Sequence, residues 1–225
     1  MSSRNGQDEW VIETLRDKRE GYFIDSGAAH SRINSNTFRL EIEYGWSGIC
    51  VEPNPALFAT LKQDRMCHCV MAALSNKAGT AKLTIPEMGS GELGALDEFL
   101  VNDMWKRHRE AAKRIVVETV TIWELLVKFN APEVIDYWSL DTEGSEDVIL
   151  ESFPWALYRV LLLSVEHNFV EAKKLKVREF MQQRGYSVVE REQNLAEDYF
   201  IHSSVDRSPF VRPQTTAKIT QLRRL

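Results

Sequence analysis

The sequence has few cysteines, no long apolar run and no surplus of basic residues, and each of these absences removes a class of protein. Three cysteines among 225 residues are an odd number that does not suit a disulfide framework, so we expect reduced thiols in the core. The longest apolar-rich run, 160–165, is much shorter than the ~20 residues of a membrane-spanning helix. The first ten residues contain no apolar signal segment. We therefore expect no membrane span and a cytoplasmic protein.

Charge and length narrow the choice further. The formal net charge of −5 argues against general nucleic-acid binding, so we expect no nucleic-acid partner. A chain of 225 residues is long enough for one α/β domain with a full core and too short for two domains of ordinary size. We expect a single domain over 1–205, followed by a basic C-terminal tail over 206–225.

The loop after the first predicted strand lacks the glycines of a dinucleotide site. The run GYFIDSGAAHS, 21–31, opens with a buried-looking strand from Tyr22 to Asp25 and continues into a loop of small residues. Counted from Gly27, Ala29 and Arg32 occupy the second and third glycine positions of G-x-G-x-x-G. Those glycines let bare backbone amides face a pyrophosphate. Their absence argues against the interpretation as a nicotinamide-dependent dehydrogenase. It favours a cofactor without phosphate.

A second short strand ends in an acid that suits a nucleoside. The run GICVEPNP, 48–55, places Glu52 where an α/β nucleotide-type site has the carboxylate that accepts two ribose hydroxyls. S-adenosylmethionine fits both features, since Glu52 would bind its ribose and the first loop would accept its amino-acid end. The alternative is an ordinary strand and turn in an α/β core.

Strand and helix patterns alternate along most of the chain. This alternation predicts an α/β fold with a mostly parallel sheet covered on both faces, and the last two strands predict a C-terminal antiparallel hairpin. Ser35 is the expected N-cap of the second helix. The predicted helices cover 8–19, 35–44, 55–64, 123–129 and 170–184, and the predicted core strands cover 22–25, 48–52, 68–74, 134–141, 159–166, 186–190 and 198–203.

The alternation stops between residues 82 and 118. A short strand, a glycine-rich turn and a polar stretch follow one another there, and we interpret this insertion as a lid over a site. Its basic residues either contact an anionic or polyhydroxyl substrate or form the solvated face of a helix. They are Lys106, Arg107, His108, Arg109, Lys113 and Arg114.

Acidic residues end the core strands and should gather at one rim of the sheet. Buried acids repel one another and lose hydration, so such a rim needs a ligand, a cation or hydrogen-bond donors. The predicted members are Asp25, Glu52, Asp141 with Glu143, and Glu166 with His167.

His167 has two candidate roles and one structural alternative. With an unperturbed pKa of about 6.5, it could take a proton from a hydroxyl at neutral pH. It could instead bind magnesium or manganese together with Asp141 and Glu166. A lone histidine is also often structural, and the sequence does not separate these roles.

Eight ordered blocks make the chain resemble the FkbM family of S-adenosylmethionine-dependent methyltransferases. The likeness extends over roughly 7–203 and lies in QDEWV, GYFIDSGA, SNTFRLE, YGWSGICVEPNP, DRMC, YWSLDTEGSEDVIL, VEHN and DYFI. The resemblance implies a class I methyltransferase fold, a Rossmann-like three-layer sandwich. It also implies methyl transfer to a hydroxyl, often on a sugar or a secondary metabolite.

The resemblance also implies roles for individual residues. It places Asp25, Gly27 and Ala28 against the methionine part of the cofactor and Glu52 on the ribose. Asn36 and Thr37 would line the first loop, while Asp141 and Glu143 would face the transferred methyl group. The chain departs from the family after the Gly-Ala pair, where Ala29, His30 and Ser31 replace an acidic or amide residue and a glycine.

The sequence therefore predicts an O-methyltransferase for a small-molecule or glycan acceptor, most simply a sugar hydroxyl. The catalytic residues would be Asp141, Glu143 and His167. Alternative acceptors are hydroxyls of a polyketide or lipid metabolite. A protein that binds the cofactor without catalysis and serves as an interaction module is the other alternative.

Overall fold

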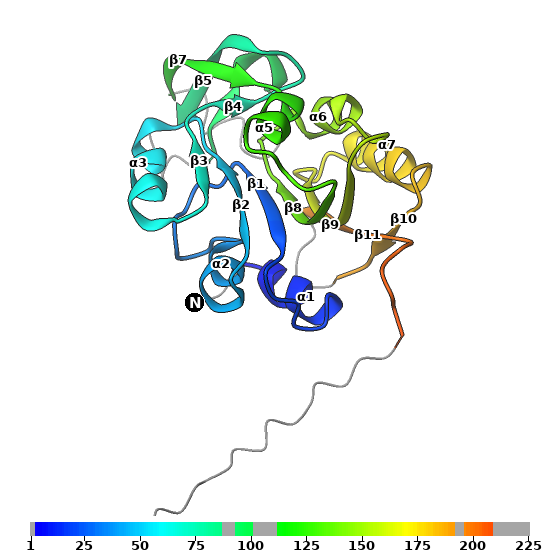
Figure 1. The fold of residues 1–225 in the computed structure, drawn as a ribbon. Coiled ribbons are helices and arrows are strands. Elements are labelled where there is room, and N and C mark those ends of the chain that lie inside the picture. The colour runs from blue at the N-terminus through cyan, green and yellow to red at the C-terminus, as the bar shows by residue number, and fades with distance from the viewer. Residues whose placement is uncertain (1–2, 87–92, 101–111, 192–195, 209–225) are drawn as a thin grey trace, which may run out of the picture.

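The main sheet has seven strands in the order β10-β11-β9-β8-β1-β2-β3 (Figure 1). The computed structural model describes residues 3–86, 93–100, 112–191 and 196–208. Six of these strands run in the same direction, and β11 alone is antiparallel, to its neighbours β9 and β10. The strands are β1 (Tyr22–Ser26), β2 (Ser47–Val51), β3 (His68–Val70), β8 (Val134–Leu140), β9 (Arg159–Glu166), β10 (Tyr186–Val189) and β11 (Glu197–His202). The predicted fold class, including the C-terminal antiparallel hairpin, is confirmed.

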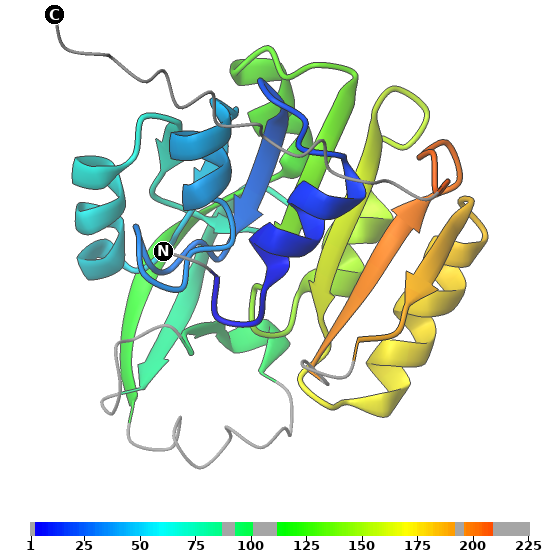
Figure 2. The ribbon, with the colours of Figure 1, turned by 90° about the horizontal axis from the view of Figure 1, so that it is seen from below.

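Helices cover both faces of this sheet, because apolar side chains along each strand point alternately to one face and to the other. Phe23 and Tyr137 pack with α1 (Gln7–Thr14), α2 (Phe38–Tyr44) and α3 (Pro55–Asp64). Ile24 and Trp138 point to the other face and pack with α5 (Ile122–Lys128), α6 (Glu146–Ser152) and α7 (Glu171–Gln182). Figure 2 shows α1 and α2 in front of the strands. No helix in the described ranges is long and apolar enough to cross a membrane.

The strand register brings the acids to one edge. Ser26 of β1 pairs with Val51 of β2 and with Leu140 of β8, and Leu140 pairs in turn with Val165 of β9. The residues that follow these four positions are Gly27, Glu52, Asp141 and Glu166. Parallel register alone therefore aligns three carboxylates and a glycine along the carboxyl edge.

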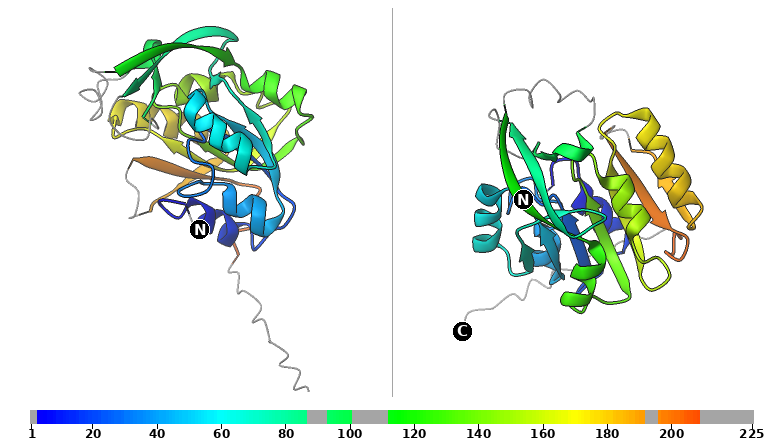
Figure 3. Two further views of the ribbon diagram at one scale, coloured as in Figure 1. Left: turned by 90° about the vertical axis from the view of Figure 1, so that its left-hand side faces the viewer. Right: turned by 90° about the horizontal axis from the view of Figure 1, so that it is seen from above.

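A second, smaller sheet occupies the region of the predicted insertion. Its order is β4-β7-β5-β6, formed by β4 (Ala73–Leu74), β7 (Ala112–Val120), β5 (Gly79–Pro86) and β6 (Ala95–Leu96) with the short helix η1 (Asp97–Phe99). Leu83 and Val117 are at the centre of its small core. Figure 3 shows it beyond one end of the main sheet. The predicted strand 68–74 is wrong as one element, because its first part joins the main sheet and its last two residues join this one.

Most of the predicted basic cluster and tail lies outside the described residues. Lys106, Arg107, His108 and Arg109 fall in 101–111, and the tail beyond residue 208 is likewise not described. Lys113 and Arg114 lie on β7, where Arg114 is paired with Asp97.

Two predicted helix boundaries need correction. The first helix ends at Thr14 rather than at residue 19, because Arg16 and Asp17 both adopt φ of 57°, which a helix cannot continue. The N-cap of α2 is Thr37 rather than Ser35, although the Ser35 hydroxyl accepts a hydrogen bond from the Phe38 N–H at 3.2 Å.

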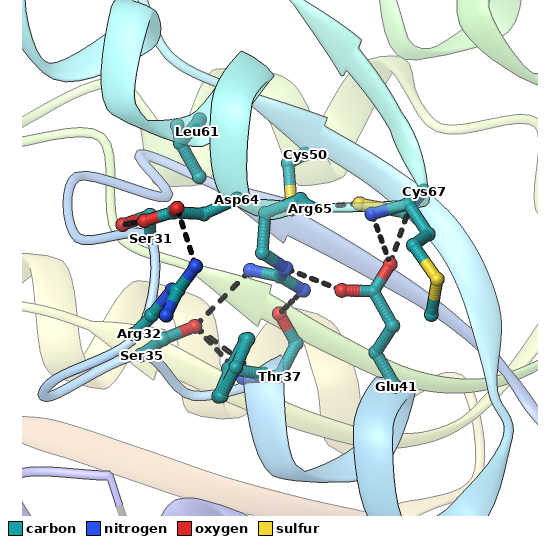
Figure 4. Close-up of polar contacts among 12 residues, drawn as sticks. Ser31, Arg32, Ser35, Thr37, Glu41, Cys50, Leu61, Asp64, Arg65 and Cys67 are labelled. Atoms are coloured by element: carbon teal, nitrogen blue, oxygen red, sulfur yellow. Dashed lines mark hydrogen bonds and ion pairs between the residues drawn. The ribbon is translucent and has the colours of Figure 1, made fainter.

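A buried ion pair joins α2 to the end of α3 (Figure 4). Nε of Arg65 donates to Oε2 of Glu41 at 2.6 Å, and both side chains are almost fully buried. The other carboxylate oxygen accepts the N–H groups of Met66 and Cys67 at 3.1 and 2.6 Å. Glu41 therefore ties α2 to the segment that enters β3.

We expect Arg65→Met to lower the free energy of unfolding by about 3–5 kcal/mol, because it leaves the Glu41 carboxylate buried beside an apolar chain. Denaturant titration followed by tryptophan fluorescence measures this loss. Lys77→Met is the control, since the Lys77–Glu98 pair is exposed and its loss should cost less than about 1 kcal/mol. Equal, small effects of both substitutions would contradict the assignment.

Candidate functional site

Two adjoining cavities open at the carboxyl edge of the main sheet and share Gly27, Asp141 and Glu143. The larger has a volume of about 310 Å³ and a mostly polar wall. The smaller, of about 30 Å³, lies between the loop after β2 and the second sheet. The wall of the larger cavity consists of Arg4, Asn5, Gln7, Asp25, Gly27, Ala28, Ala29, His30, Asn34, Asn36, Leu93, Asp141, Glu143, Glu166, Asn168, Phe169, Ala196 and Glu197. Glu52, Val51, Pro53, Asn54, Ala73, Leu74, Leu83 and Leu96 contribute to the smaller one.

Gly27 allows the first loop to lie against the end of β8. Its φ is +75°, and a Cβ atom built on it would lie 1.7 Å from the carbonyl oxygen of Asp141. The N–H groups of Gly27 and Ala28 both donate to the Val51 carbonyl, at 3.0 and 3.1 Å. No side chain fits at this position, so the glycine determines where the two cavities meet.

Glu52 is held by one backbone N–H on each carboxylate oxygen. Ala29 donates to Oε2 at 2.9 Å, and Asn54 donates to Oε1 at 2.7 Å. Burial raises the pKa of Glu52 to about 7, although the two N–H groups oppose that rise. Each oxygen keeps a second lone pair that can accept from a ligand hydroxyl. Ala29, at a position where the chain departs from the FkbM pattern, thus takes part in the site through its backbone.

Asp25 lies in the wall of the larger cavity with only 2% of its surface exposed. Burial raises the pKa of its carboxyl, while Arg65 and the Thr37 hydroxyl counteract that rise. Asn36 also lies in the wall, and its amide donates to Ser139 Oγ at 2.8 Å. Thr37 was predicted to line the first loop beside the cofactor, but it is fully buried behind Asp25. Its hydroxyl donates to the Asp25 carboxylate at 2.6 Å.

Three carboxylates meet at the centre of the edge. Asp141, Glu143 and Glu166 each offer an oxygen, and these oxygens lie within 4.8 Å of one another. The amide of Asn168 donates to Glu143 at 3.1 Å and to Glu166 at 2.9 Å. Burial raises the pKa of Asp141 to about 6, and burial together with Asp141 and Glu143 raises the pKa of Glu166 well above its usual range. Both shifts have the same physical cause, since carboxylates this close together and this buried destabilise one another's charged form.

Glu146 supports the loop that carries Asp141 and Glu143. One of its oxygens accepts the N–H groups of Thr142 and Gly144 at 2.7 and 3.2 Å, and the other pairs with Lys173. The carboxylate is fully buried at the first residue of α6. Its contacts hold the loop in shape, including the positive φ of Glu143.

The structure corrects the expected position of His167. Its ring is buried toward Asp198, with Nε2 3.9 Å from that carboxylate, and it is in the wall of neither described cavity. Burial lowers the pKa of the ring. Glu166 at the end of β9 and Asn168 in the turn after it, with φ of 49°, line the larger cavity, whereas His167 between them does not. The roles of base and metal ligand predicted for His167 do not fit this geometry.

The sequence analysis missed Asn168 as a site residue. Strand alternation does not signal it, because Asn168 lies in the turn after β9 with φ of 49°. The predicted cation ligands were Asp141, Glu166 and His167. In the structure, Glu143 rather than His167 lies with Asp141 and Glu166 in the group that could hold a cation.

Comparison with known proteins agrees with this geometry. A sequence model of the methyltransferase FkbM domain matches residues 25–188. No curated protein matches the chain. Among solved structures, the METTL16 methyltransferase domain is similar at a TM-score of 0.50 and 10% identity, with 88% of this chain and 66% of that chain covered.

Two further structures are more distant. PH1948 of Pyrococcus horikoshii, suggested to act on RNA, has a TM-score of 0.43 at 10% identity over 88% of this chain and 81% of its own. TYW2 of M. jannaschii in complex with AdoMet has a TM-score of 0.34 at 10% identity over 89% and 75%. These identities bear on the fold and not on the acceptor. The fold is that of the class I methyltransferases, and since the domain model matches residues 25–188, well over half of the chain, the chain belongs to the FkbM family of S-adenosylmethionine-dependent methyltransferases.

Proposed function

We propose that this protein transfers a methyl group from S-adenosylmethionine to a hydroxyl oxygen of a polyhydroxylated acceptor, a sugar or glycan. The observation that carries the proposal is the meeting of the two cavities at Gly27, Asp141 and Glu143. One compartment has the wall of a nucleoside site, and the other has the wall of a polar acceptor site.

The wall of the smaller compartment suits the adenosine part, whose binding would have to widen the cavity beyond its volume of about 30 Å³. Side chains such as Pro53, Leu74 and Leu83 give it an apolar wall for adenine, and Glu52 offers two hydrogen-bond acceptors to the ribose hydroxyls. The amino-acid end would then extend past Gly27 and Ala28 toward Asp25 and Asn36. This orientation brings the sulfonium, which supplies the methyl group, to the point shared by the two cavities.

The larger compartment suits an acceptor with several hydroxyls. Asn5 and Asn34 offer amide groups that both donate and accept hydrogen bonds, as a polyol requires. Phe169 lies at the same wall with 56% of its surface exposed and with φ of +58°, a conformation that is costly for an aromatic residue. This polar wall favours a sugar or glycan over the hydroxyl of a polyketide or lipid.

Asp141 is the group placed to accept the acceptor's proton. With a pKa of about 6, Asp141 is ionised at neutral pH while remaining basic enough for general-base catalysis. Alignment of the acceptor oxygen against the methyl group would supply most of the rate enhancement. Glu143, fixed by Asn168, adds negative charge beside the transferred group.

A bound cation is a second candidate for activation of the hydroxyl. Asp141, Glu143 and Glu166 provide the oxygen ligands that magnesium or manganese prefers. Such an ion would lower the pKa of an acceptor hydroxyl. The hydrogen bonds that already join these acids favour the general-base mechanism without an ion.

We expect Glu52→Gln to weaken binding of S-adenosylmethionine about tenfold to a hundredfold, because hydrogen bonds to a charged acceptor contribute about 1.5–3 kcal/mol. The wild-type affinity should rise as the pH increases through about 7, since ribose hydroxyls prefer the ionised carboxylate. The substitution should remove this pH dependence. Titration calorimetry between pH 6 and 8 measures both effects.

The exposed Glu118 provides the matched control for that experiment. Glu118→Gln should leave the affinity and its pH dependence unchanged. Unaltered affinity in Glu52→Gln would remove Glu52 from the cofactor site.

We expect Asp141→Asn and Glu143→Gln to lose most methyl transfer while the melting temperature stays near that of the wild type. Both amides keep the size of the side chain but remove its charge and its basicity. Radiolabelled methyl transfer to a panel of sugars measures turnover, and thermal unfolding measures stability. Asp147→Asn, on α6 outside both cavities, is the control. Unstable variants with full activity per folded molecule would make the pair structural.

Chelation separates the two activation mechanisms. We expect EDTA to leave turnover unchanged, because Asp141 can accept the proton without an ion. Loss of turnover that magnesium or manganese restores would assign the cation to the three acids instead. Binding of S-adenosylmethionine without turnover of any hydroxylated acceptor would favour a cofactor-binding interaction module.

A further inference from the structure

A chain of hydrogen bonds leads from the buried Arg65 to the wall of the larger cavity. Nη2 of Arg65 donates to the Thr37 hydroxyl at 2.9 Å, and that hydroxyl donates to Oδ2 of Asp25 at 2.6 Å. Figure 4 shows the Arg65 guanidinium between Glu41, Ser35 and Thr37. The chain thus connects the ion pair that joins α2 to α3 with an acid at the cofactor site.

The chemistry of the guanidinium group determines which group donates and which accepts in these hydrogen bonds. A guanidinium group has donors and no acceptor, so the Thr37 hydroxyl accepts from Arg65. Its single proton must then go to Asp25. The arrangement requires an accepting oxygen at Oδ2 of Asp25, and it holds the carboxylate plane in one orientation. Within the described part of the chain, the other oxygen, Oδ1, has no hydrogen-bond partner, and Asp25 lines the cavity.

The Thr37 hydroxyl takes part in this connection instead of capping the N-terminus of α2. A threonine at an N-cap usually accepts a hydrogen bond from an N–H of the first helical turn. At the N-cap of α2 the Thr37 side chain makes no such bond, and the Ser35 hydroxyl accepts from Phe38 instead. The hydroxyl of Thr37 is therefore turned from the helix toward Asp25.

We propose that Arg65 and Thr37 are positioning residues that hold Asp25 with Oδ1 directed at the ammonium group of the cofactor's amino-acid end. This inference rests on the proposed function, which places that end of S-adenosylmethionine beside Asp25. The positive charge of Arg65 favours the ionised carboxylate, whereas Glu52 and Asp141, which also face Asp25, disfavour it. Arg65 and Thr37 touch neither cavity in the described structure, so their effect must pass through Asp25.

Two thioether ligands that differ only in the amino-acid end provide the test. S-adenosylhomocysteine carries the ammonium and carboxylate groups, and 5′-methylthioadenosine lacks both. Thr37→Val removes the hydroxyl and keeps the shape of the side chain. We expect it to weaken binding of S-adenosylhomocysteine about tenfold and to leave binding of 5′-methylthioadenosine unchanged. Direct calorimetry and competition between the two ligands measure the ratio of affinities.

Three further variants separate positioning from stability. Thr37→Ser keeps the hydroxyl and should restore the wild-type ratio. Ser35→Ala removes another partner of Arg65, at 3.2 Å from Nη1, and should lower stability without changing the ratio. Arg65→Lys keeps the charge beside Glu41 but lacks the second nitrogen that reaches Thr37, so it should reproduce the loss seen in Thr37→Val.

The outcomes are distinguishable. Equal weakening of both ligands in Thr37→Val, or no weakening of either, would overturn the proposed connection while wild-type binding still supported the function. Should Thr37→Val fail to fold, an unchanged ratio in Arg65→Lys would overturn it equally. Failure of the wild-type protein to bind S-adenosylhomocysteine would instead refute the proposed function.

Discussion

Burial of carboxylates along one edge of the sheet is the main energetic constraint on this protein. Unpaired buried charges are costly, and here each acid has donors of its own. Glu52 has two backbone N–H groups, Asp25 has the Thr37 hydroxyl, and Glu143 has the Asn168 amide. Glu166 accepts from the same amide, and burial raises its pKa and that of Asp141. The loops at this edge owe their shapes to these donors, and the acids that result are available to a ligand.

Backbone geometry determines where the ligand can lie. Gly27 lets the first loop approach Asp141 so closely that the same residues form the boundary of both cavities. The second sheet contributes Leu83 and Leu96 to the smaller cavity, so the insertion between β4 and α5 completes the compartment proposed for adenosine. The lid predicted for 82–118 stays a prediction, and residues 87–92 and 101–111 of that stretch lie outside the described structure.

Membership of the FkbM family and the class I fold indicate methyl transfer from S-adenosylmethionine. The residues of the cavity wall indicate the chemical class of the acceptor. Amide side chains near the N-terminus of α1 and in the loop before α2 surround the acids, and an exposed aromatic ring lies beside them. A polyhydroxylated acceptor matches this wall better than a hydrocarbon chain does. Arg65 and Thr37 extend the site beyond the residues that could touch a ligand.

Much of this arrangement could be predicted from the sequence by itself. Apolar runs ending in Asp25, Glu52, Asp141 and Glu166 predicted parallel strands with acids at one edge, because parallel register brings equivalent strand ends together. Only the tertiary structure decided that His167 faces Asp198, that Asn168 binds two of the acids, and that β4 leaves the main sheet. It also decided that Thr37 bonds to Asp25 and Arg65 rather than capping its helix. The physical reason is that strand ends follow from local pattern, whereas the direction of a side chain beyond a strand depends on packing against residues distant in the sequence.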